Sequence, residues 1–307
     1  MLRENQLTLE SELAFFAQIA KARTLTQVAR ELDYSVAAVS KRLSALERNL
    51  GVKLLRRSPR ALSLTDEGER LLTGANQIMN AVEQLRSDVC GPNNAPSGRL
   101  RINGTFGFGR RFLAPIIDQY TQQYPDVEVQ LILTDMPLNL AAHAIDICIW
   151  LDPLPEARLI ARKIAACKRI VCASPVYLKQ MGTPVVPADL VKHRCLVLRQ
   201  TDSSFANWRF SRGRTTESVR VGGHLSSNDG EVIKQWTLAG RGIMIRSEWD
   251  VSQEIAQRKL VQLLPDYQSS ASDIVAWYQP GQQRSARITR FLELLTDTMK
   301  GAQAWRM

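Results

Sequence analysis

Hydrophobic positions near the start of the chain recur with the spacing of helices that bury one face. In the first predicted helix they fall at 4-3-4 intervals, at Leu9, Leu13, Phe16 and Ala20. Thr24 and Ser35 are expected to begin a second and a third helix as capping residues. The third helix repeats the interval in positions predicted to point inward: Val39, Leu43, Leu46 and Leu50. Gly51 suits the left-handed residue that ends a helix.

The third predicted helix leaves a face of small, hydroxyl-bearing and basic residues toward solvent. Its outward positions are Ala37, Ala38, Ser40, Lys41 and Arg42. Small side chains let a helix approach the major groove of DNA, hydroxyls bond base edges or phosphates, and Lys and Arg neutralise phosphates. The pattern therefore predicts a helix-turn-helix that binds DNA, and the alternative is a solvated basic surface.

A short hairpin and a long helix are predicted next. Residues 53–64 are expected to form two short strands around a basic tip that carries Arg56, Arg57 and Arg60. Thr65 is expected to cap a helix that runs to about Val89 and has an acidic first turn, as the helix dipole favours. One apolar stripe follows this helix: Leu71, Leu72, Ala75, Ile78, Met79, Val82, Leu85 and Val89. Such a stripe favours dimerisation through a partner helix, with packing against its own chain as the alternative.

A linker rich in Gly, Pro and Asn at 91–98 precedes about 200 residues in which strand and helix patterns alternate. Strands are predicted at 99–103, 127–133, 146–150, 169–173, 195–198, 220–225, 243–245 and 274–278. Helices are predicted at 112–124, 231–239, 248–257 and 284–298. The alternation indicates mainly parallel sheets covered by helices. The length favours two subdomains with a cleft, at about 99–165 with 271–307 and at about 166–270.

Positive charge is concentrated in the predicted DNA-binding region. The whole chain of 307 residues has a formal net charge of +10. Ten basic and three acidic residues lie between Lys21 and Arg60, and 10 minus 3 places +7 of that charge there. A uniformly basic surface would not concentrate charge in this way, so the distribution supports a polyanionic partner.

Composition argues against several other classes of protein. The five cysteines are scattered without a Cys-x-x-Cys pair, which is typical of reduced thiols in a cytosolic protein. The three histidines have no ligands at metal-binding spacing, so no metal and no cofactor are expected. The N-terminus lacks the pattern of a signal peptide, and no apolar run is long enough to span a membrane. Neither a Gly-x-Ser-x-Gly elbow nor a Cys–His pairing indicates an enzyme.

A glycine-rich turn at 104–109 lies between a predicted strand and a predicted helix. The turn does not fit a dinucleotide fold, because Phe112 stands where a third glycine is needed and no suitably placed acidic residue follows. A small anion fits better, since Thr105 offers a hydroxyl beside helix N–H groups and Arg110 and Arg111 add positive charge. Simple helix capping by Thr105 is the alternative.

A second polar turn at 226–230 also follows a predicted strand and opens a helix. Ser227 and Asn228 are expected to cap that helix, and its start could face Thr105 across the cleft. Two facing helix starts with hydroxyls would bind a carboxylate. The loop at 201–204 could also reach the cleft, although a plain surface turn is the simpler interpretation.

The N-terminal motifs resemble those of LysR-type transcriptional regulators. The resemblance covers nearly the whole chain and is most specific at Phe15, 24–29, 39–43, 46–47, 50–57 and 64–68. It implies an α/β protein with a winged helix-turn-helix at 1–65, a dimerising linker helix at 66–90, a hinge linker at 91–98 and a periplasmic-binding-protein-like effector domain at 99–307. It also implies a cytoplasmic homotetramer that binds promoter DNA and a small metabolite. RNA polymerase is a further candidate partner.

The resemblance assigns DNA contacts by position. It places base and phosphate contacts of the recognition helix at Val36, Ala37, Ser40 and Lys41, and wing contacts at Arg57 and Arg60. Arg42 joins this set as an outward basic residue of the same helix. Family members often carry Gln in place of Val36, so a contact between Val36 and a thymine methyl is expected instead of a hydrogen bond to a base.

The effector half resembles a subgroup that regulates tartrate and malate catabolism, through residues 101–110, 223–228 and 242–249. By family position Thr105, Asp135, Met136, Thr201 and Asn228 would line the cleft, with Phe106 and Ser227 beside them. A small hydroxy acid or dicarboxylate is therefore the expected effector. The alternative is a small-anion-binding protein or an enzyme with an appended oligomerisation module, for which a basic wing would have no use.

Overall fold

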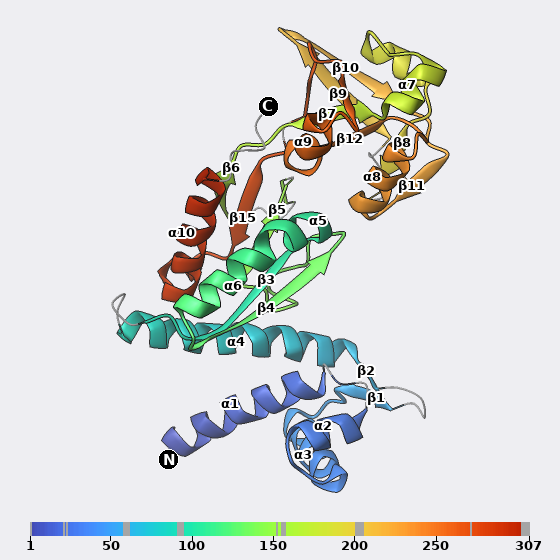
Figure 1. The fold of residues 1–307 in the computed structure, drawn as a ribbon. Coiled ribbons are helices and arrows are strands. Elements are labelled where there is room, and N and C mark those ends of the chain that lie inside the picture. Colours follow the sequence, from blue (N-terminus) through green and yellow to red (C-terminus); the bar gives the residue numbers. More distant parts are fainter. Residues whose placement is uncertain are drawn as a thin grey trace. The chain divides into compact units, whose positions relative to one another are not determined.

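The computed structural model describes residues 2–20, 22, 24–57, 62–90, 95–151, 153–154, 158–199, 206–270 and 272–301 (Figure 1). Contacts between residues divide the chain into two units. The first comprises Met1–Asn94 with Asn139–Ile145, and the second comprises Ala95–Leu138 with Asp146–Met307. Among the described residues, no helix is long and apolar enough to cross a membrane.

The first unit contains the predicted three helices and hairpin. Its elements are α1 (Leu2–Ile19), α2 (Leu25–Glu31), α3 (Val36–Leu50), β1 (Leu55–Arg57), β2 (Leu62–Leu64) and α4 (Asp66–Cys90). The caps are confirmed, because Thr24 Oγ1 accepts a hydrogen bond from the Gln27 amide at 3.2 Å and Ser35 Oγ accepts one from the Ala38 amide at 3.1 Å. Strands β1 and β2 pair antiparallel.

A compact core holds α1, α2, α3 and β1 together. Phe16, Val28, Leu43 and Leu54 are almost fully buried in it. The prediction that Leu50 points inward is wrong, since Leu50 is 47% exposed. Helix α3 ends at that residue, and the chain turns back at Gly51 (φ +70°) so that the Val52 amide reaches the Glu47 carbonyl.

Helix α4 is buried at its start and exposes apolar side chains farther along. Leu71 and Leu72 pack against the N-terminal core, and Ala75 is buried. Beyond them Ile78, Val82 and Leu85 are 46%, 41% and 64% exposed. Among the described side chains, the stripe is therefore buried within the first unit in its first half, and Ile78, Val82 and Leu85 farther along are exposed.

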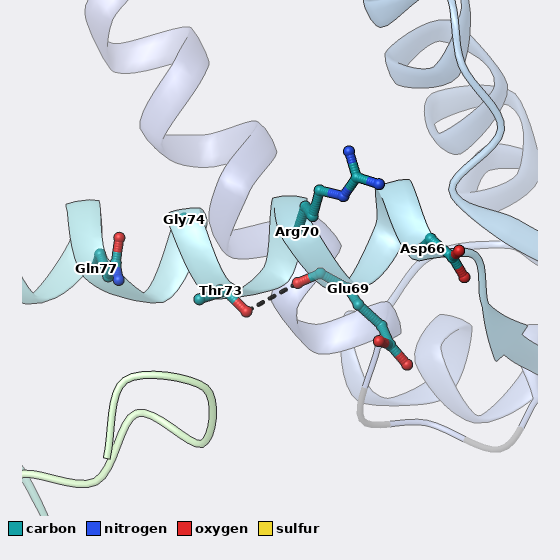
Figure 2. A pocket seen from close by; sticks show the side chains of 6 residues that line it. All are labelled: Asp66, Glu69, Arg70, Thr73, Gly74 and Gln77. Carbon is teal, nitrogen blue, oxygen red and sulfur yellow. Dashed lines mark hydrogen bonds between the residues drawn. The ribbon is translucent and has the colours of Figure 1, made fainter. Parts of the chain in front are cut away.

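The polar face of α4 borders a shallow hollow. Its lining residues are Asp66, Glu69, Arg70, Thr73, Gly74 and Gln77. All six project from one helix, and the Thr73 hydroxyl donates a hydrogen bond to the Glu69 carbonyl at 2.9 Å (Figure 2). Binding sites for small molecules draw side chains from several elements, so this hollow is not a candidate effector site.

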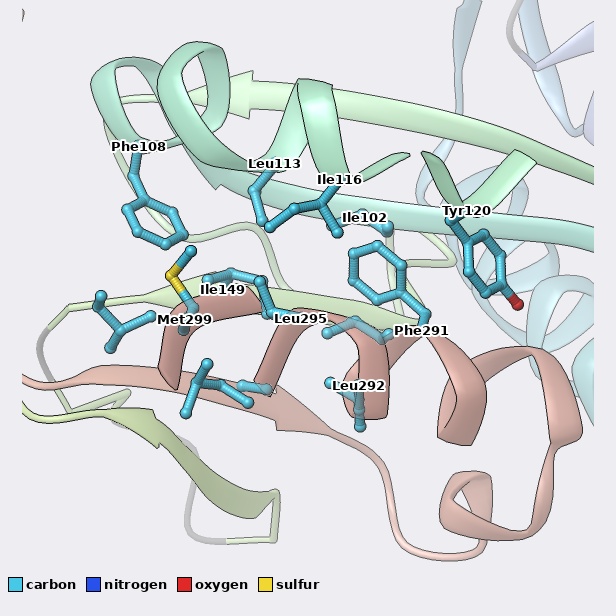
Figure 3. Packing of buried hydrophobic residues seen from close by; sticks show 14 of the residues in the cluster. Ile102, Phe108, Leu113, Ile116, Tyr120, Ile149, Phe291, Leu292, Leu295 and Met299 are labelled. Carbon is cyan, nitrogen blue, oxygen red and sulfur yellow. The ribbon is translucent and has the colours of Figure 1, made fainter. Parts of the chain in front are cut away.

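The second unit begins with a five-stranded sheet. Its strands are β3 (Gly98–Thr105), β4 (Val127–Thr134), β5 (Ile147–Trp150), β6 (Ile160–Ala165) and β15 (Ile274–Tyr278), in the order β4-β3-β5-β15-β6. A helical run of α5 (Phe106–Phe108), the π-helical turn η1 (Gly109–Leu113) and α6 (Ala114–Gln123) packs on it together with η3 (Gln282–Arg284) and α10 (Ala286–Gly301). Figure 3 shows Phe108, Leu113 and Ile116 in one core with Leu295 and Met299 of α10.

The remaining elements form smaller sheets with cores of their own. The strands are β7 (Arg169–Ala173), β8 (Leu196–Leu198), β9 (Asn207–Arg212), β10 (Thr215–Arg220), β11 (Leu225–Ser227), β12 (Met244–Ser247), β13 (Val261–Leu263) and β14 (Gln268–Ser269). They pair as β12-β7-β13, β11-β8 and β10-β9-β14. The helices are α7 (Pro175–Met181), η2 (Pro187–Lys192), α8 (Gly230–Leu238) and α9 (Glu248–Ala256).

Two predictions about this unit are wrong. The sheets are mixed rather than mainly parallel: β15 runs antiparallel to β5 and β6, because the chain returns to the first sheet from the other strand group. The predicted strand at 220–225 is also absent, since β10 ends at Arg220 and β11 starts at Leu225. Between them Gly223 passes so close to Val197 and the Cys195 carbonyl that a Cβ would not fit.

Candidate functional site

The outer face of α3 is the exposed side of the helix-turn-helix. Val36, Ala37 and Lys41 are exposed, and Ser40 is half-buried. Val36 and Ala37 stand in the first turn, directly after the capping Ser35. The structure thus brings these four predicted contact residues together on one side of α3, opposite the buried Val39 and Leu43.

Arg42 is not an outward residue as predicted. Its Nε lies 2.8 Å from Glu12 Oε1, and its Nη2 donates to Ser11 Oγ at 2.8 Å. The guanidinium carbon also lies 4.2 Å from the centre of the Phe15 ring. Because α1 supplies a carboxylate and an aromatic face, Arg42 folds back across α1 and ties it to the recognition helix.

Glu47 joins the recognition helix to the hairpin, a role that sequence patterns did not reveal. Its side chain is 5% exposed; Oε1 accepts the Leu54 amide at 3.0 Å and Oε2 lies 2.7 Å from Lys53 Nζ. Burial alone would raise the pKa of Glu47, but the Lys53 ammonium and the backbone amides outweigh it and hold the pKa below its usual value. A carboxylate at the inward edge of a basic helix was the available signal.

The start of α4 is fixed against the two residues that precede β1. The Thr65 hydroxyl donates to the Lys53 carbonyl at 2.6 Å and accepts the Gly68 amide at 3.0 Å, which confirms Thr65 as the cap. A Cβ on Gly68 would lie 3.1 Å from the Leu54 carbonyl carbon and closer still to its oxygen. Only glycine allows α4 to approach the hairpin this closely.

The predicted wing contacts lie mostly outside the described residues. Arg57 is the last residue of β1. Arg60 lies outside the described residues, as does the predicted effector residue Thr201. Arg56 is exposed and lies 3.6 Å from Asp66.

In the effector domain, Thr105 and Phe106 stand where β3 passes into the helical run. Thr105 is the cap residue of α5 but its side chain makes no capping hydrogen bond, so the simple capping interpretation is wrong. The run then widens into the π-helical turn η1, a distortion often found at functional sites.

Buried Asn103 shapes the neighbouring strand end. Its Nδ2 donates to the Ile132 carbonyl at 3.0 Å and to Thr134 Oγ1 at 2.9 Å, and its Oδ1 accepts the Leu138 amide at 3.1 Å. Thr134 in turn donates to the Met136 carbonyl at 2.6 Å. Asn103 therefore fixes the turn that carries the predicted residues Asp135 and Met136, although the resemblance through this stretch assigned it no role.

The two predicted halves of the effector site meet in the structure. Asn228 Nδ2 donates to Asp135 Oδ2 at 2.5 Å, and Arg110 lies 3.7 Å from Asp229 Oδ2. The capping prediction for α8 needs correction: Asp229 is the cap and accepts the Glu231 amide at 2.7 Å. The Ser227 hydroxyl accepts the Asp229 amide at 3.1 Å, which leaves the Asn228 side chain to bridge toward Asp135.

Neither a metal-binding cluster nor a reactive thiol is found among the His, Cys, Asp and Glu side chains in the part of the chain that the structure describes. No group of three His, Cys, Asp or Glu side chains there could hold a metal ion. Cys148 and Cys195 are buried, and burial raises the pKa of each thiol to about 12. A thiol with such a pKa is not a nucleophile near neutral pH.

A winged helix-turn-helix followed by a long helix and a domain of α/β sheets defines a DNA-binding regulator with an effector-binding domain. The model of the bacterial regulatory helix-turn-helix protein, lysR family, matches residues 11–69, and that of the LysR substrate binding domain matches residues 93–300. The chain belongs to the LysR family of transcriptional regulators. Such proteins bind promoter DNA, oligomerise and hold a small effector; they are not enzymes.

Transcriptional regulators of similar sequence align with almost the whole chain. The HTH-type transcriptional regulator DmlR of Escherichia coli is 38% identical over 95% of this chain and 94% of its own. The HTH-type transcriptional activator TtdR of Escherichia coli is 37% identical over the same shares. The structure of CrgA, a LysR-type regulator of Neisseria meningitidis, matches with a TM-score of 0.59 and 27% identity, over 94% of this chain and 98% of that one.

Proposed function

We propose that the outer face of α3 reads the operator through Val36, Ala37, Ser40 and Lys41, with Arg57 and Arg60 contacting DNA from the wing. The exposed, small and basic face of α3 supports this proposal. Arg42 is not proposed as a DNA contact, because its guanidinium contacts Glu12 and Phe15. We propose that a regulator of promoter DNA acts in the cytoplasm.

Neighbouring basic residues give a matched test of the DNA surface. Operator fragments selected by the protein from random double-stranded DNA are titrated at several salt concentrations. Lys41→Ala should lower the slope of log affinity against log salt by about 0.9, the value for one phosphate contact. Arg42→Ala should leave the slope unchanged and lower the melting temperature instead. An unchanged slope in Lys41→Ala would remove Lys41 from the DNA surface.

We infer that chains dimerise through the exposed half of the α4 stripe and assemble further into tetramers. The support is the exposure of Ile78, Val82 and Leu85, spaced four and three residues apart on one helix face. Contact between the assembly and RNA polymerase stays a prediction.

For the effector we propose a small hydroxy acid or dicarboxylate, bound by Thr105, Phe106, Asp135, Met136, Ser227 and Asn228. Thr201, which lies outside the described residues, stays a predicted contact. The observation that carries the proposal is the Asn228–Asp135 contact, which joins the two strand groups next to Thr105. Arg110 adds a cation at the same junction. An amide, a hydroxyl and a guanidinium suit a carboxylate, and Asp135 suits a hydroxyl donor.

A thermal-shift series tests the effector class. Malate, tartrate and succinate are added to the full-length protein, with a sugar and an amino acid as controls, because binding to the folded state raises the melting temperature. Succinate differs from malate by one hydroxyl, so a larger shift with malate would support donation to Asp135. Thr105→Val should reduce the shift and Thr121→Val, whose hydroxyl bonds the Ile117 carbonyl, should not. No shift with any acid would overturn the proposed effector class.

A further inference from the structure

The first three residues of α9 contact three different parts of the effector domain. Glu248 begins the helix where the chain crosses between the strand groups: its amide donates to the Lys168 carbonyl at 2.9 Å and its Oε1 lies 3.3 Å from Lys168 Nζ. At the same crossing the Cys167 amide donates to Asp273 Oδ1 at 3.1 Å. Helix α9 is therefore fixed at the crossing, and Trp249 and Asp250 extend from it to either side.

Trp249 packs against the segment that follows Thr105. Its ring centre lies 5.6 Å from that of Phe108 and 5.7 Å from that of Phe112, at interplanar angles of 73° and 84°. Trp249 is 3% exposed and belongs to the core of the five-stranded sheet. A Cβ on Gly107 would lie 3.3 Å from Trp249 Cη2, so the glycine lets the turn approach the indole ring closely.

Asp250 holds the opposite segment, the start of α8. Arg246 donates to Asp250 Oδ2 from Nε at 2.7 Å and from Nη2 at 2.6 Å, and Lys234 Nζ of α8 lies 3.2 Å from Oδ1. A Cβ on Gly230 would overlap the Arg246 guanidinium, so that group lies directly against the first turn of α8. Burial alone would raise the pKa of Asp250, but the charges of Arg246 and Lys234 outweigh it and keep the carboxylate ionised.

We propose that α9 is the element that couples the two sides of the effector site, with Trp249 positioning the 105–112 side and Asp250 positioning the 228–233 side. Neither residue needs to touch the ligand. A ligand that changes the relation between the sides has to move or strain α9, because adjacent residues of one helical turn hold both. The functional role of this coupling rests on the proposed effector site. The coupling itself depends only on contacts within the chain.

Hydrogen exchange of the full-length, ligand-free protein tests the coupling. Trp249→Phe should raise amide exchange by roughly tenfold in residues 106–112, which it contacts, and also measurably in 228–233, which it does not. Asp250→Asn should raise amide exchange strongly in residues 228–233, which it positions, and also measurably in 106–112. Trp236→Phe and Glu254→Gln are matched controls. Trp236 packs against the core that contains Ile233 and Met244. Glu254 Oε1 lies 3.6 Å from Lys234 Nζ. Neither control should change exchange in 106–112.

Exchange changes confined to the side that each variant touches would overturn the proposal, because α9 would then be structural packing only. In variants that remain folded, a second measurement addresses function: the ratio of operator affinities with and without malate should fall toward one in Trp249→Phe. If malate, tartrate and succinate fail to affect the wild type, the proposed effector class fails, while the exchange result still decides the coupling. The two failures are therefore distinguishable.

Discussion

Two glycines of α4 should respond in opposite directions to the same substitution. A Cβ on Gly68 would lie 3.1 Å from the Leu54 carbonyl carbon and 3.2 Å from Leu64 Cδ2, and closer still to the Leu54 oxygen. Backbone of the hairpin has to shift to admit it, which costs about 1–3 kcal/mol as overpacking. A Cβ on Gly74 would have nothing within 4 Å. Gly74→Ala should therefore gain about 1 kcal/mol of helix propensity.

Thermal unfolding of the full-length protein, followed by circular dichroism, measures the contrast. Gly74→Ala should raise the melting temperature of the N-terminal unit, and Gly68→Ala should lower it by about 4 °C or more. Because β1 is the strand that moves, Gly68→Ala should also weaken operator binding, while Gly74→Ala should not. If Gly68→Ala proves as stable as Gly74→Ala, the close approach of α4 to Leu54 is not a constraint and the reasoning is refuted.

Three further predictions concern single side chains. The pKa of Glu47 is lower in the folded protein than its unfolded value near 4.5, so the ionised carboxylate stabilises the fold above that pH. This contribution is lost as the pH falls through the folded-state pKa. The free energy of unfolding of Glu47→Gln should therefore fall less than that of the wild type in an acid titration. Leu85→Asp should convert oligomers to smaller species in sedimentation velocity, while Gln77→Asp on the polar face should not. Asn103→Ala should lower the free energy of unfolding by about 3 kcal/mol in urea titrations, since it removes hydrogen bonds to two part-buried groups of β4 and to the Leu138 amide, whereas exposed Asn207→Ala should be neutral.

Periodicity predicted the first unit well because each of its signals is local. Thr24, Ser35 and Thr65 cap the helices that they were expected to cap, and Gly51 ends α3 in the left-handed conformation. Arg42 could not be placed from its own helix, because its partner Glu12 lies 30 residues earlier in the chain. A basic residue at a helix surface remains ambiguous until the neighbouring helix is known.

In the effector domain, several buried strands were predicted from the sequence, but their direction was not. Strands β7 and β15 were predicted at their observed bounds. Their antiparallel partners could not be predicted, since β12 and β13 approach β7 from about 70 and 90 residues away. The short strands β9 and β10 were missed because their exposed arginines and threonines interrupt the apolar pattern.

The contact between Asn228 and Asp135 bears on how an acidic effector could act as a switch. Within the domain, the Asp135 carboxylate already accepts a hydrogen bond from the Asn228 amide. At the proposed site, an anion would compete with Asp135 for Asn228 and would be repelled by that carboxylate, a cost that a hydrogen bond donated to Asp135 would offset. The ligand shifts the equilibrium only by its difference in affinity between the joined and separated arrangements. A hydroxy acid supplies both a carboxylate for Asn228 and a hydroxyl for Asp135, whereas an unsubstituted dicarboxylate supplies only the first.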